Sequence, residues 1–352
     1  MVTDYEKICS FENLYKAHLA ARRSKRHKGD VIKFELNLAN NLIMLQKQLE
    51  ERTFRTEGYY QFVLHEPKRR EIHAPYYVDR VLQHCVCDEV LRPVIQPRLI
   101  YDNAACQVGK GTHFAMKRLT KFLSEHYKKH GTTGYFLKCD ITRYFGSIDH
   151  EILKTKLAKV IVDKDVLNLL SHYIDSYHTE GLPGKGLPLG NQSSQWFGIF
   201  YMDSLDRMIK EKMQIKYYVR YMDDFILVHH DKEYLKQCLA KIQDCVRDDL
   251  KMELNHKTQI FPIKNGAEFL GFRFYLTETG KVIRKMKVQS KLRFKRRLRK
   301  MQDDYTNGKI ELEEVKSILA SYKGHFKHGH TYKLRTKIFS EFVLKRERDE
   351  PE

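Results

Sequence analysis

Apolar residues recur along the chain at two different spacings, which predict helices in some segments and strands in others. In the first 50 residues they return every three or four positions, the spacing of a helix. The second helix expected there carries on one side Leu36, Ala39, Ile43 and Gln46. The same spacing predicts later helices over 76–86, 113–129, 194–213 and 232–250.

Alternating or continuously apolar runs predict the strands. Residues 59–64 alternate, and a second short strand is expected around Ile72, after a turn. Further strands are expected at 135–141, 258–262 and 269–276. The run 217–228 is apolar on both sides of Met222 and Asp223, which predicts a β-hairpin with these two residues at its turn.

The C-terminal segment is expected to be helical from about residue 281 and is strongly basic. Its apolar residues at helical spacing are Phe294, Leu298, Met301 and Tyr305. Residues 281–300 contain 11 Lys and Arg and no Asp or Glu. Because a merely solvated helix face usually carries both signs, we expect this surface to contact phosphates. The candidate nucleic-acid contacts are Arg284, Lys285, Lys291, Arg293, Arg296, Arg297 and Lys300.

The whole chain shares this excess of positive charge. Its 352 residues include 64 Lys and Arg against 45 Asp and Glu, a formal net charge of +19. That balance favours a polyanionic partner, either nucleic acid or an anionic membrane surface. Hydrophobic residues at 42% supply a folded core, which excludes a disordered basic tail. No run of about 18 apolar residues is present, so we expect no membrane partner.

Two smaller features add to this description. Seven cysteines without a C-x-x-C pair predict free thiols in a reducing compartment, rather than disulfides or a zinc ribbon. A second basic run consists of Arg22, Arg23, Lys25, Arg26 and Lys28. This run is either a nucleic-acid contact or a solvated helix end, and the sequence leaves both interpretations open.

The candidate chemistry lies in carboxylates at strand ends. Asp223 and Asp224 are adjacent at the tip of an apolar hairpin, where folding needs no such pair. Asp140 lies at the polar end of the predicted strand 135–141, directly after the largely apolar residues 135–139. If the strands are neighbours, Asp140 and Asp223 can hold two divalent ions about 4 Å apart, the geometry used for phosphoryl transfer. The other interpretations are a solvated turn and a helix N-cap at Asp140.

These motifs and others in the same order resemble those of reverse transcriptases. Asp140 with Phe145 resembles the first palm motif, and the run 221–224, Tyr-Met-Asp-Asp, resembles the second. Residues 67–80 and 109–113 resemble the fingers motifs of the family. Residues 254–258 and 269–272 resemble later palm motifs. The resemblance covers about residues 60–275.

The resemblance implies an α+β right-hand polymerase fold with fingers, an antiparallel palm sheet with helices, and a helical thumb. The implied boundaries are N-terminal helices and fingers at 1–135, a palm at 136–280 with an inserted segment near 150–185, and a basic helical thumb at 281–352. The implied function is RNA-directed DNA synthesis from a structured template RNA, with an RNA–cDNA duplex, dNTPs and two Mg²⁺ ions, or Mn²⁺ in their place.

Roles follow at the matched positions. The implied catalytic residues are Asp140, Asp223 and Asp224, and the metal set adds Ile141. The implied dNTP contacts are Lys68, Arg70, Phe145, Gly190 and Lys257. The implied primer grip is Phe269, Leu270 and Gly271. Phe145 is expected to exclude a 2′-hydroxyl by steric conflict, and a core aromatic is the alternative interpretation. For Lys257 the alternative is a simple turn.

One motif departs from the usual reverse transcriptase form, and this departure narrows the resemblance to a subgroup of the family. Where most reverse transcriptases carry Gln-Gly followed by Ser-Pro, this chain has Leu189-Gly190 followed by Ser194-Gln195, a form that resembles diversity-generating retroelements. Leucine offers packing where glutamine can hydrogen-bond, so about 1–3 kcal/mol of geometric discrimination is expected to be lost. With Leu189 and Gln195 as fidelity residues, the resemblance implies misincorporation opposite template adenine. Leu189 as ordinary core is the alternative.

The subgroup also implies a setting and partners. It implies a cytoplasmic, bacterial or phage-encoded protein with a small basic accessory protein. Another bacterial reverse transcriptase, of phage-defence or retron type, is the nearest alternative. A non-catalytic RNA-binding scaffold is the alternative from another class.

Overall fold

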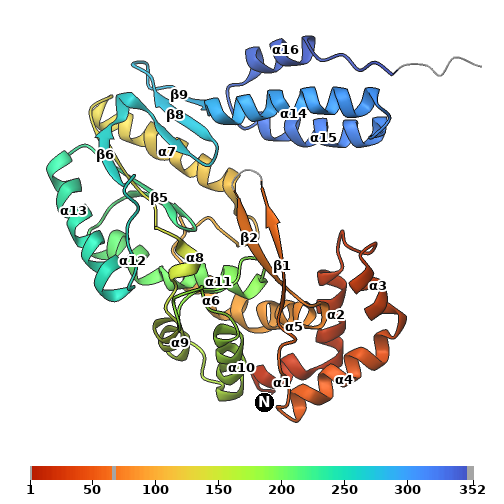
Figure 1. The fold of residues 1–352 in the computed structure, drawn as a ribbon. Coiled ribbons are helices and arrows are strands. Elements are labelled where there is room, and N and C mark those ends of the chain that lie inside the picture. The colour runs from red at the N-terminus through yellow and green to blue at the C-terminus, as the bar shows by residue number, and fades with distance from the viewer. Residues whose placement is uncertain (1, 66–68, 347–352) are drawn as a thin grey trace, which may run out of the picture.

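The computed structural model describes residues 2–65 and 69–346 (Figure 1). The N-terminal part is helical and consists of α1 (Asp4–Cys9), α2 (Phe11–Ala21), α3 (Gly29–Leu36) and α4 (Leu38–Glu50). A capping box starts α1, because the Thr3 hydroxyl accepts from the Glu6 amide at 3.1 Å and the Glu6 carboxylate accepts from the Thr3 amide at 2.7 Å.

The predicted apolar face of the second helix, which joined Leu36, Ala39, Ile43 and Gln46, is wrong. The buried residues of α4 are Leu42, Leu45 and Leu49, whereas Leu36 is 82% exposed and Ile43 is 52% exposed. The chain leaves helical geometry at Asn37, with φ −133°, so Leu36 belongs to α3 and does not share a face with α4.

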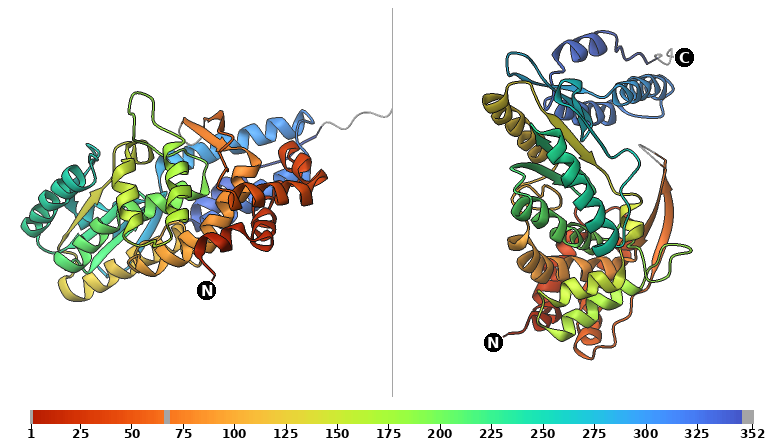
Figure 2. Two further views of the ribbon diagram at one scale, coloured as in Figure 1. Left: turned by 90° about the horizontal axis from the view of Figure 1, so that it is seen from below. Right: turned by 90° about the vertical axis from the view of Figure 1, so that its left-hand side faces the viewer.

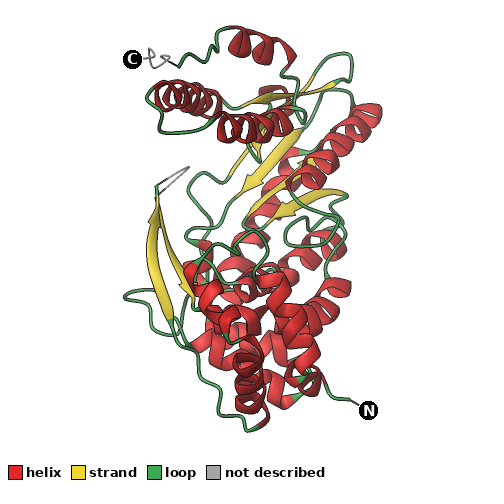
Figure 3. Cartoon of the chain, turned by 90° about the vertical axis from the view of Figure 1, so that its right-hand side faces the viewer, coloured by secondary structure: helices red, strands yellow, loops and turns green. Residues whose placement is uncertain are grey.

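The fingers hairpin stands beside this helical part (Figures 1 and 3). It pairs β1 (Tyr59–Leu64) with β2 (Arg70–Pro75) antiparallel, from Tyr59 opposite Pro75 to Leu64 opposite Arg70. Both expected strands are confirmed. The chain then continues as α5 (Tyr77–Val86), the π-helical turn η1 (Cys87–Leu91), α6 (Arg92–Ile95), the 3₁₀ turn η2 (Gln96–Arg98) and α7 (Thr112–His130).

A four-stranded antiparallel sheet forms the palm, in the order β4-β5-β3-β6. Its strands are β3 (Tyr135–Cys139), β4 (Tyr217–Tyr221), β5 (Asp224–His229) and β6 (Gln259–Pro262). The predicted hairpin at 217–228 is confirmed as β4 and β5. Between β3 and β4 lie α8 (Tyr144–Ser147), α9 (His150–Ala158), α10 (Lys164–Asp175), α11 (Gln192–Tyr201), α12 (Asp203–Arg207) and the π-helical turn η3 (Met208–Lys212). After β5 come α13 (Lys232–Asp244) and the π-helical turn η4 (Cys245–Asp249).

Both faces of the palm sheet are buried, which explains its uninterrupted apolar strands. Leu137 and Leu227 face the hydrophobic cluster of the N-terminal and inserted helices. Phe136 and Ile226 face a second cluster that includes α7 and the C-terminal helices. The sheet therefore joins the two halves of the core and fixes the ends of its strands.

The C-terminal part begins with a small sheet, and here the expectation of helix from residue 281 is wrong. After the 3₁₀ turn η5 (Ile263–Asn265), the sheet consists of β7 (Ala267–Phe269), β8 (Phe272–Leu276) and β9 (Val282–Met286). Strand β9 pairs antiparallel with β8, from Leu276 opposite Val282 to Phe272 opposite Met286, and these two end residues of β9 are buried. Helices α14 (Val288–Thr306), α15 (Leu312–Phe326) and α16 (Tyr332–Ser340) follow, at the end of the molecule opposite the N-terminal helices (Figure 2).

The helices and antiparallel sheets confirm the expected α+β class. All seven cysteines are free. Among the described residues, no helix is both long enough and apolar enough to cross a membrane.

Candidate active site

The candidate catalytic carboxylates lie where two neighbouring strands of the palm sheet meet. Strands β3 and β5 pair antiparallel, with Cys139 opposite Phe225. Asp140 therefore follows the last residue of β3, and Asp224 is the first residue of β5. Asp223 occupies the β4–β5 turn directly before it. The register of the sheet thus brings together carboxyls from two separate motifs.

The β4–β5 turn holds one residue in an unfavourable conformation. Tyr221 and Asp224 are the last cross-strand pair, so Met222 and Asp223 form the turn between them. Met222 has φ +55°, in the left-handed region that favours glycine. A side chain in this region costs about 1–2 kcal/mol, so contacts elsewhere in the fold must hold the turn.

Burial and mutual repulsion disfavour the ionised forms of Asp223 and Asp224. Burial raises the pKa of Asp223 to about 6, and the neighbouring Asp140 and Asp224 add to the rise. Burial also raises the pKa of Asp224, although Lys138 opposes that shift. The Lys138 Nζ lies 3.4 Å from Oδ1 of Asp224, an oxygen that accepts no hydrogen bond from the described residues. Carboxyls gathered in this way favour a cation between them.

The same carboxyls fit a divalent ion that shares its coordination with a substrate. Mg²⁺ is commonly bound by one or two protein carboxylates together with substrate phosphates and water. In the described part of the chain, no group of three or more His, Cys, Asp and Glu side chains is arranged to hold a metal by itself. Asp140 and Asp223 fit an open site of the shared kind. Ile141, the other expected ligand, lies next to Asp140 with its side chain buried and its main chain bridged to Leu254.

A cavity of about 600 Å³ opens beside Asp140 and is lined by several cations. They are Lys138, Lys257, Arg273 and Lys287. Lys287 is also paired with Glu268 at 3.0 Å, and Lys138 donates to the Glu268 carbonyl at 2.6 Å. The cavity is large enough for a polyphosphate, and its cations suit one.

Lys257 reaches this cavity because its loop is hydrogen-bonded to the end of strand β3. The Asn255 amide donates to the Asp140 carbonyl at 2.7 Å, and the Asn255 side-chain oxygen accepts from the Lys257 amide at 3.0 Å. Lys257, one of the predicted dNTP contacts, therefore lines the same cavity as Asp140. The two hydrogen bonds of Asn255 hold the Lys257 turn beside Asp140.

The glycine-rich segment docks on the fingers hairpin. The His73 amide of β2 donates to the Leu189 carbonyl at 3.0 Å. Gly190 has φ +133°, and a Cβ there would lie 3.0 Å from the His73 carbonyl oxygen and 3.2 Å from Ile72 Cγ2. Glycine is required by both the conformation and the close approach. Leu189 is half-buried at this contact, beside the backbone rather than deep in the core.

Phe145 lies in the short helix α8, which follows strand β3 and contacts α11. The Tyr144 hydroxyl donates to the Gly198 carbonyl, and the Leu187 amide donates to the Phe145 carbonyl at 2.8 Å. A Cβ at Gly198 would lie 3.2 Å from the Phe145 ring. Burial raises the pKa of Tyr144, and the charge of Asp223 contributes, which locates α8 near the carboxyls.

Two further candidates, Arg70 of the fingers and Gln195 of the fidelity pair, lie on the surface. Arg70 is exposed at the start of β2. Lys68 lies outside the described residues. Gln195 is exposed on α11 and accepts from the Cys106 thiol at 3.2 Å. Among the described residues, no hydrogen bond joins Gln195 to Asp140, Asp223 or Asp224.

The primer-grip candidates form the tight β7–β8 turn. Phe269 pairs with Phe272, and Leu270 and Gly271 between them have φ +47° and +88°. Two consecutive positive φ values are typical of a type I′ hairpin turn. Phe269 is fully buried, and the Gly271 carbonyl accepts from the Lys287 amide at 3.2 Å. The turn is thereby attached to the start of α14.

The basic candidates divide between two elements. Arg284 and Lys285 lie on β9, where the Arg284 amide donates to His330 at 3.1 Å, so their expected helical placement is wrong. The others lie on α14 and are Lys291, Arg293, Arg296, Arg297 and Lys300. None of these five forms an ion pair with another described residue. Their charge is available to an external anion.

Sequence reasoning missed Lys138, Glu268 and Lys287. Lys138 carried a signal, because a lysine two positions before Asp140 in an apolar strand lies on the same face as the carboxyl. Glu268 and Lys287 carried none, since their contacts depend on long-range pairing of the small C-terminal sheet.

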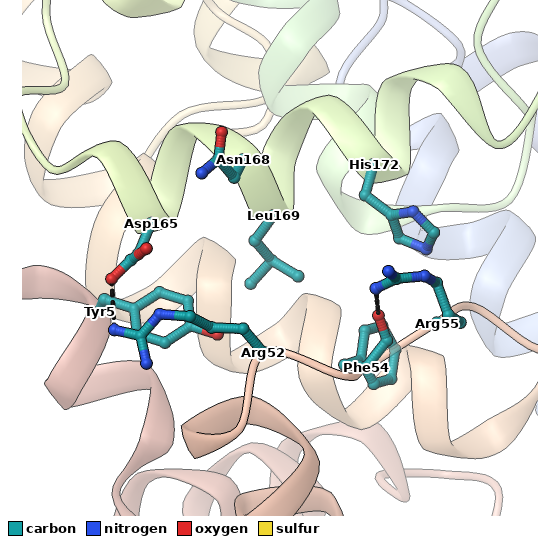
Figure 4. A pocket seen from close by; sticks show the side chains of 8 residues that line it. All are labelled: Tyr5, Arg52, Phe54, Arg55, Asp165, Asn168, Leu169 and His172. Carbon is teal, nitrogen blue, oxygen red and sulfur yellow. Dashed lines mark hydrogen bonds and ion pairs between the residues drawn. The ribbon is translucent and has the colours of Figure 1, made fainter.

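A second cavity, of about 390 Å³, lies between α1, the segment before β1 and α10 (Figure 4). Arg52 pairs with Asp165 at 2.5 Å, with its guanidinium 5.2 Å from the centre of the Tyr5 ring. Leu169 points from α10 into the space beside them. These contacts join the N-terminal helices to the inserted helices and include no residue of the carboxylate site.

Carboxyls at the meeting ends of antiparallel strands, between a fingers hairpin and C-terminal helices, define the palm of a right-hand polymerase. Residues 66–274 match the family described as reverse transcriptase (RNA-dependent DNA polymerase). Because this match spans more than half of the chain, the protein belongs to the reverse transcriptase family.

Individual relatives are distant. The putative COX1/OXI3 intron 2 protein of Saccharomyces cerevisiae is 22% identical over 260 residues, covering 54% of this chain. The chain spans 29% of that relative's length. Among solved structures, apo telomerase from Candida tropicalis, truncated from its C-terminal domain, gives a TM-score of 0.49 at 17% identity, covering 64% of this chain and 54% of that one. Telomerase from Candida albicans with a fragment of telomeric RNA gives 0.47 at 15% identity, covering 67% and 46%.

Proposed function

We propose that the protein is an RNA-directed DNA polymerase. The observation that carries the proposal is the placement of Asp140, Asp223 and Asp224 at the meeting ends of β3 and β5. Family membership supports the same chemistry. Folding alone gives no reason to gather three acids there, since burial and repulsion raise the pKa of Asp223.

The residues of the site have separable roles in this proposal. Two Mg²⁺ ions, or Mn²⁺, would supply activation of the primer 3′-hydroxyl and neutralisation of the leaving pyrophosphate. Asp140 and Asp223 would hold them, with Asp224 and the Ile141 carbonyl in support. Lys257 and its neighbouring cations in the cavity would bind the triphosphate as charge-assisted donors. Arg70 and Lys68, in the fingers motif, are the further proposed triphosphate contacts.

Phe145 is proposed to select deoxynucleotides. Its ring is held against Gly198, with no room to retreat on that side. A ring fixed in this way would collide with a 2′-hydroxyl, while a 2′-hydrogen would pass. Gly190, beside the fingers hairpin, would complete the floor of the nucleotide site.

We further propose error-prone synthesis in a diversity-generating retroelement. The support is the Leu189-Gly190 form of the motif, with Leu189 half-buried where the glycine-rich segment meets β2. An aliphatic side chain there makes no hydrogen bond around the nascent pair, which would weaken discrimination. A structured template RNA and a small basic accessory protein are the proposed partners. Residues 1–135, 136–280 and 281–352 are the proposed fingers, palm and thumb regions.

The test is primer extension on an RNA template with dNTPs and Mg²⁺, followed by sequencing of the cDNA. RNA-templated product is expected, with substitutions concentrated opposite adenine. Product without adenine-specific errors would favour a phage-defence or retron-type enzyme. Absence of product with Mg²⁺ and with Mn²⁺, with and without basic partner proteins, would contradict the proposal and favour an RNA-binding scaffold.

A further inference from the structure

A fully buried ion pair lies beneath the β4–β5 turn. Arg220 on β4 and Asp206 on α12 have 0% exposed side chains. The Arg220 Nε donates to Asp206 Oδ1 at 2.7 Å, and Nη2 donates to Oδ2 at 2.6 Å. The Tyr218 hydroxyl donates to Asp206 Oδ1 at 2.5 Å, and the Asn103 side-chain amide to Oδ2 at 3.5 Å. The carboxylate is therefore oriented from three sides and holds the guanidinium plane in a bidentate contact.

The remaining donors of Arg220 point to backbone oxygens near the active site. Nη1 donates to the Met222 carbonyl at 2.9 Å, and Nη2 donates to the Ile199 carbonyl at 2.9 Å. Met222 is the left-handed residue of the turn, immediately before Asp223. The buried Arg220 guanidinium therefore donates a hydrogen bond to the peptide group that joins Met222 to Asp223.

The backbone of Arg220 is itself fixed on the open edge of the sheet. Its amide donates to the Asp102 carbonyl at 3.1 Å, and its carbonyl accepts from the Ala104 amide at 2.9 Å. Since β5 pairs with the other edge of β4, Arg220 is held on both sides. The backbone that carries the Arg220 guanidinium is therefore held in place by the segments on both sides of β4.

We propose that Arg220, aligned by Asp206, is a positioning residue for polymerisation: its bond to the Met222 carbonyl maintains the left-handed turn and so sets the orientation of Asp223 and Asp224. This inference rests on the proposed polymerase function. Carboxylates that share an ion with substrate must be held within about 0.5 Å of the productive geometry. A turn of unfavourable φ needs an outside contact to do so, and Arg220 supplies it.

The sharpest test compares two conservative variants of neighbouring tyrosines. Tyr218→Phe removes the hydroxyl that donates to Asp206. Tyr217→Phe is the matched control, because the buried Tyr217 hydroxyl has no hydrogen-bond partner among the described residues. The expected result is a roughly threefold lower kcat for Tyr218→Phe, with dNTP KM unchanged, and wild-type values for Tyr217→Phe. Hydrogen exchange of metal-free protein should be faster across residues 221–225 only in Tyr218→Phe.

A stronger variant removes both charges. Arg220→Met with Asp206→Asn avoids an unpaired buried charge and leaves an acceptor for Tyr218, so the fold should persist. Its kcat should fall about 10–100-fold, the usual effect of losing a group that orients metal ligands, with template–primer affinity unchanged. Wild-type kcat and wild-type exchange in Tyr218→Phe would overturn the inference, as would wild-type kcat in a folded double variant. An inactive wild type would instead contradict the proposed function.

Discussion

The backbone amide of Asn255 donates to the carbonyl oxygen of Asp140 at 2.7 Å, across the loop that carries Lys257. This backbone hydrogen bond holds the loop that carries the Lys257 cation beside the end of strand β3. The Lys257 side chain is exposed and lines the cavity that Asp140 opens onto. Its charge is therefore available for an incoming phosphate.

Lys257→Met should raise the dNTP KM about 10–100-fold, because a charge-assisted hydrogen bond contributes about 1.5–3 kcal/mol. Thermal stability should not change, since the side chain is exposed. The measurement is steady-state primer extension with varied dNTP. Lys241→Met, on the exposed face of α13, is the control for loss of one charge. Equal KM values for the two variants would remove Lys257 from the nucleotide site.

Leu189→Gln should improve fidelity at template adenine. Glutamine at the junction with β2 can hydrogen-bond where leucine cannot, so the error rate opposite adenine should fall about tenfold, and errors opposite other bases should change less. Deep sequencing of cDNA provides the measurement. Leu182→Gln, at an exposed position of the same glycine-rich segment, should leave the error spectrum unchanged. An unchanged adenine error rate in Leu189→Gln would contradict the fidelity assignment.

Asp79 should make stability depend on pH. Its side chain is fully buried, with one oxygen accepting from the Glu57 amide at 3.0 Å and the other without a partner among the described residues. Burial raises the pKa of Asp79 from 3.8 to about 6. A carboxyl with a raised folded-state pKa destabilises the fold when it ionises.

The free energy of unfolding contributed by this group should therefore fall by about 3 kcal/mol as the pH rises from about 4 to about 6, and then level off. Urea unfolding at several pH values measures it. Asp79→Asn, which cannot ionise, should lose this slope and unfold at higher urea than wild type at pH 7. The same slope in both proteins would show that another group is responsible.

Helix α14 should account for much of the salt dependence of nucleic-acid binding. Each phosphate contact contributes a slope of about 0.7–0.9 in log K against log salt. Replacing Arg296, Arg297 and Lys300 with Gln should lower the slope by about 2 if each contacts one phosphate. Fluorescence anisotropy with an RNA–DNA duplex measures this slope, and Lys236→Gln on α13 is the control. A triple variant with the wild-type slope would place the duplex elsewhere.

The sequence was most informative where local pattern and long-range structure agree. Strands β4 and β5 were predictable because the apolar runs on both sides of Met222 and Asp223 have only one compact arrangement, a hairpin. The grouping of Asp140 with Asp223 needed the further assumption that their strands are neighbours. Motif order supplied that assumption, whereas periodicity alone does not contain it.

The failures have physical causes. Strand β9 was expected as helix because it directly precedes the helical pattern of Phe294, Leu298 and Met301. Its two buried residues, Val282 and Met286, are four positions apart, a spacing that fits a helix as well as a strand. The pairing of Arg220 with Asp206 had no local signal, since the two residues come from different elements and meet only when the sheet folds. Contacts of this kind require the tertiary structure.

The central claim is that the palm carboxylates carry RNA-directed DNA synthesis. Its most direct test is single-turnover primer extension on RNA by Asp223→Asn, beside Asp244→Asn, an exposed acid on α13 outside the site. Asp223→Asn should fold normally and lose at least about 1000-fold in rate, and Asp244→Asn should match wild type. A folded Asp223→Asn protein that extends primers at the wild-type rate would contradict the account.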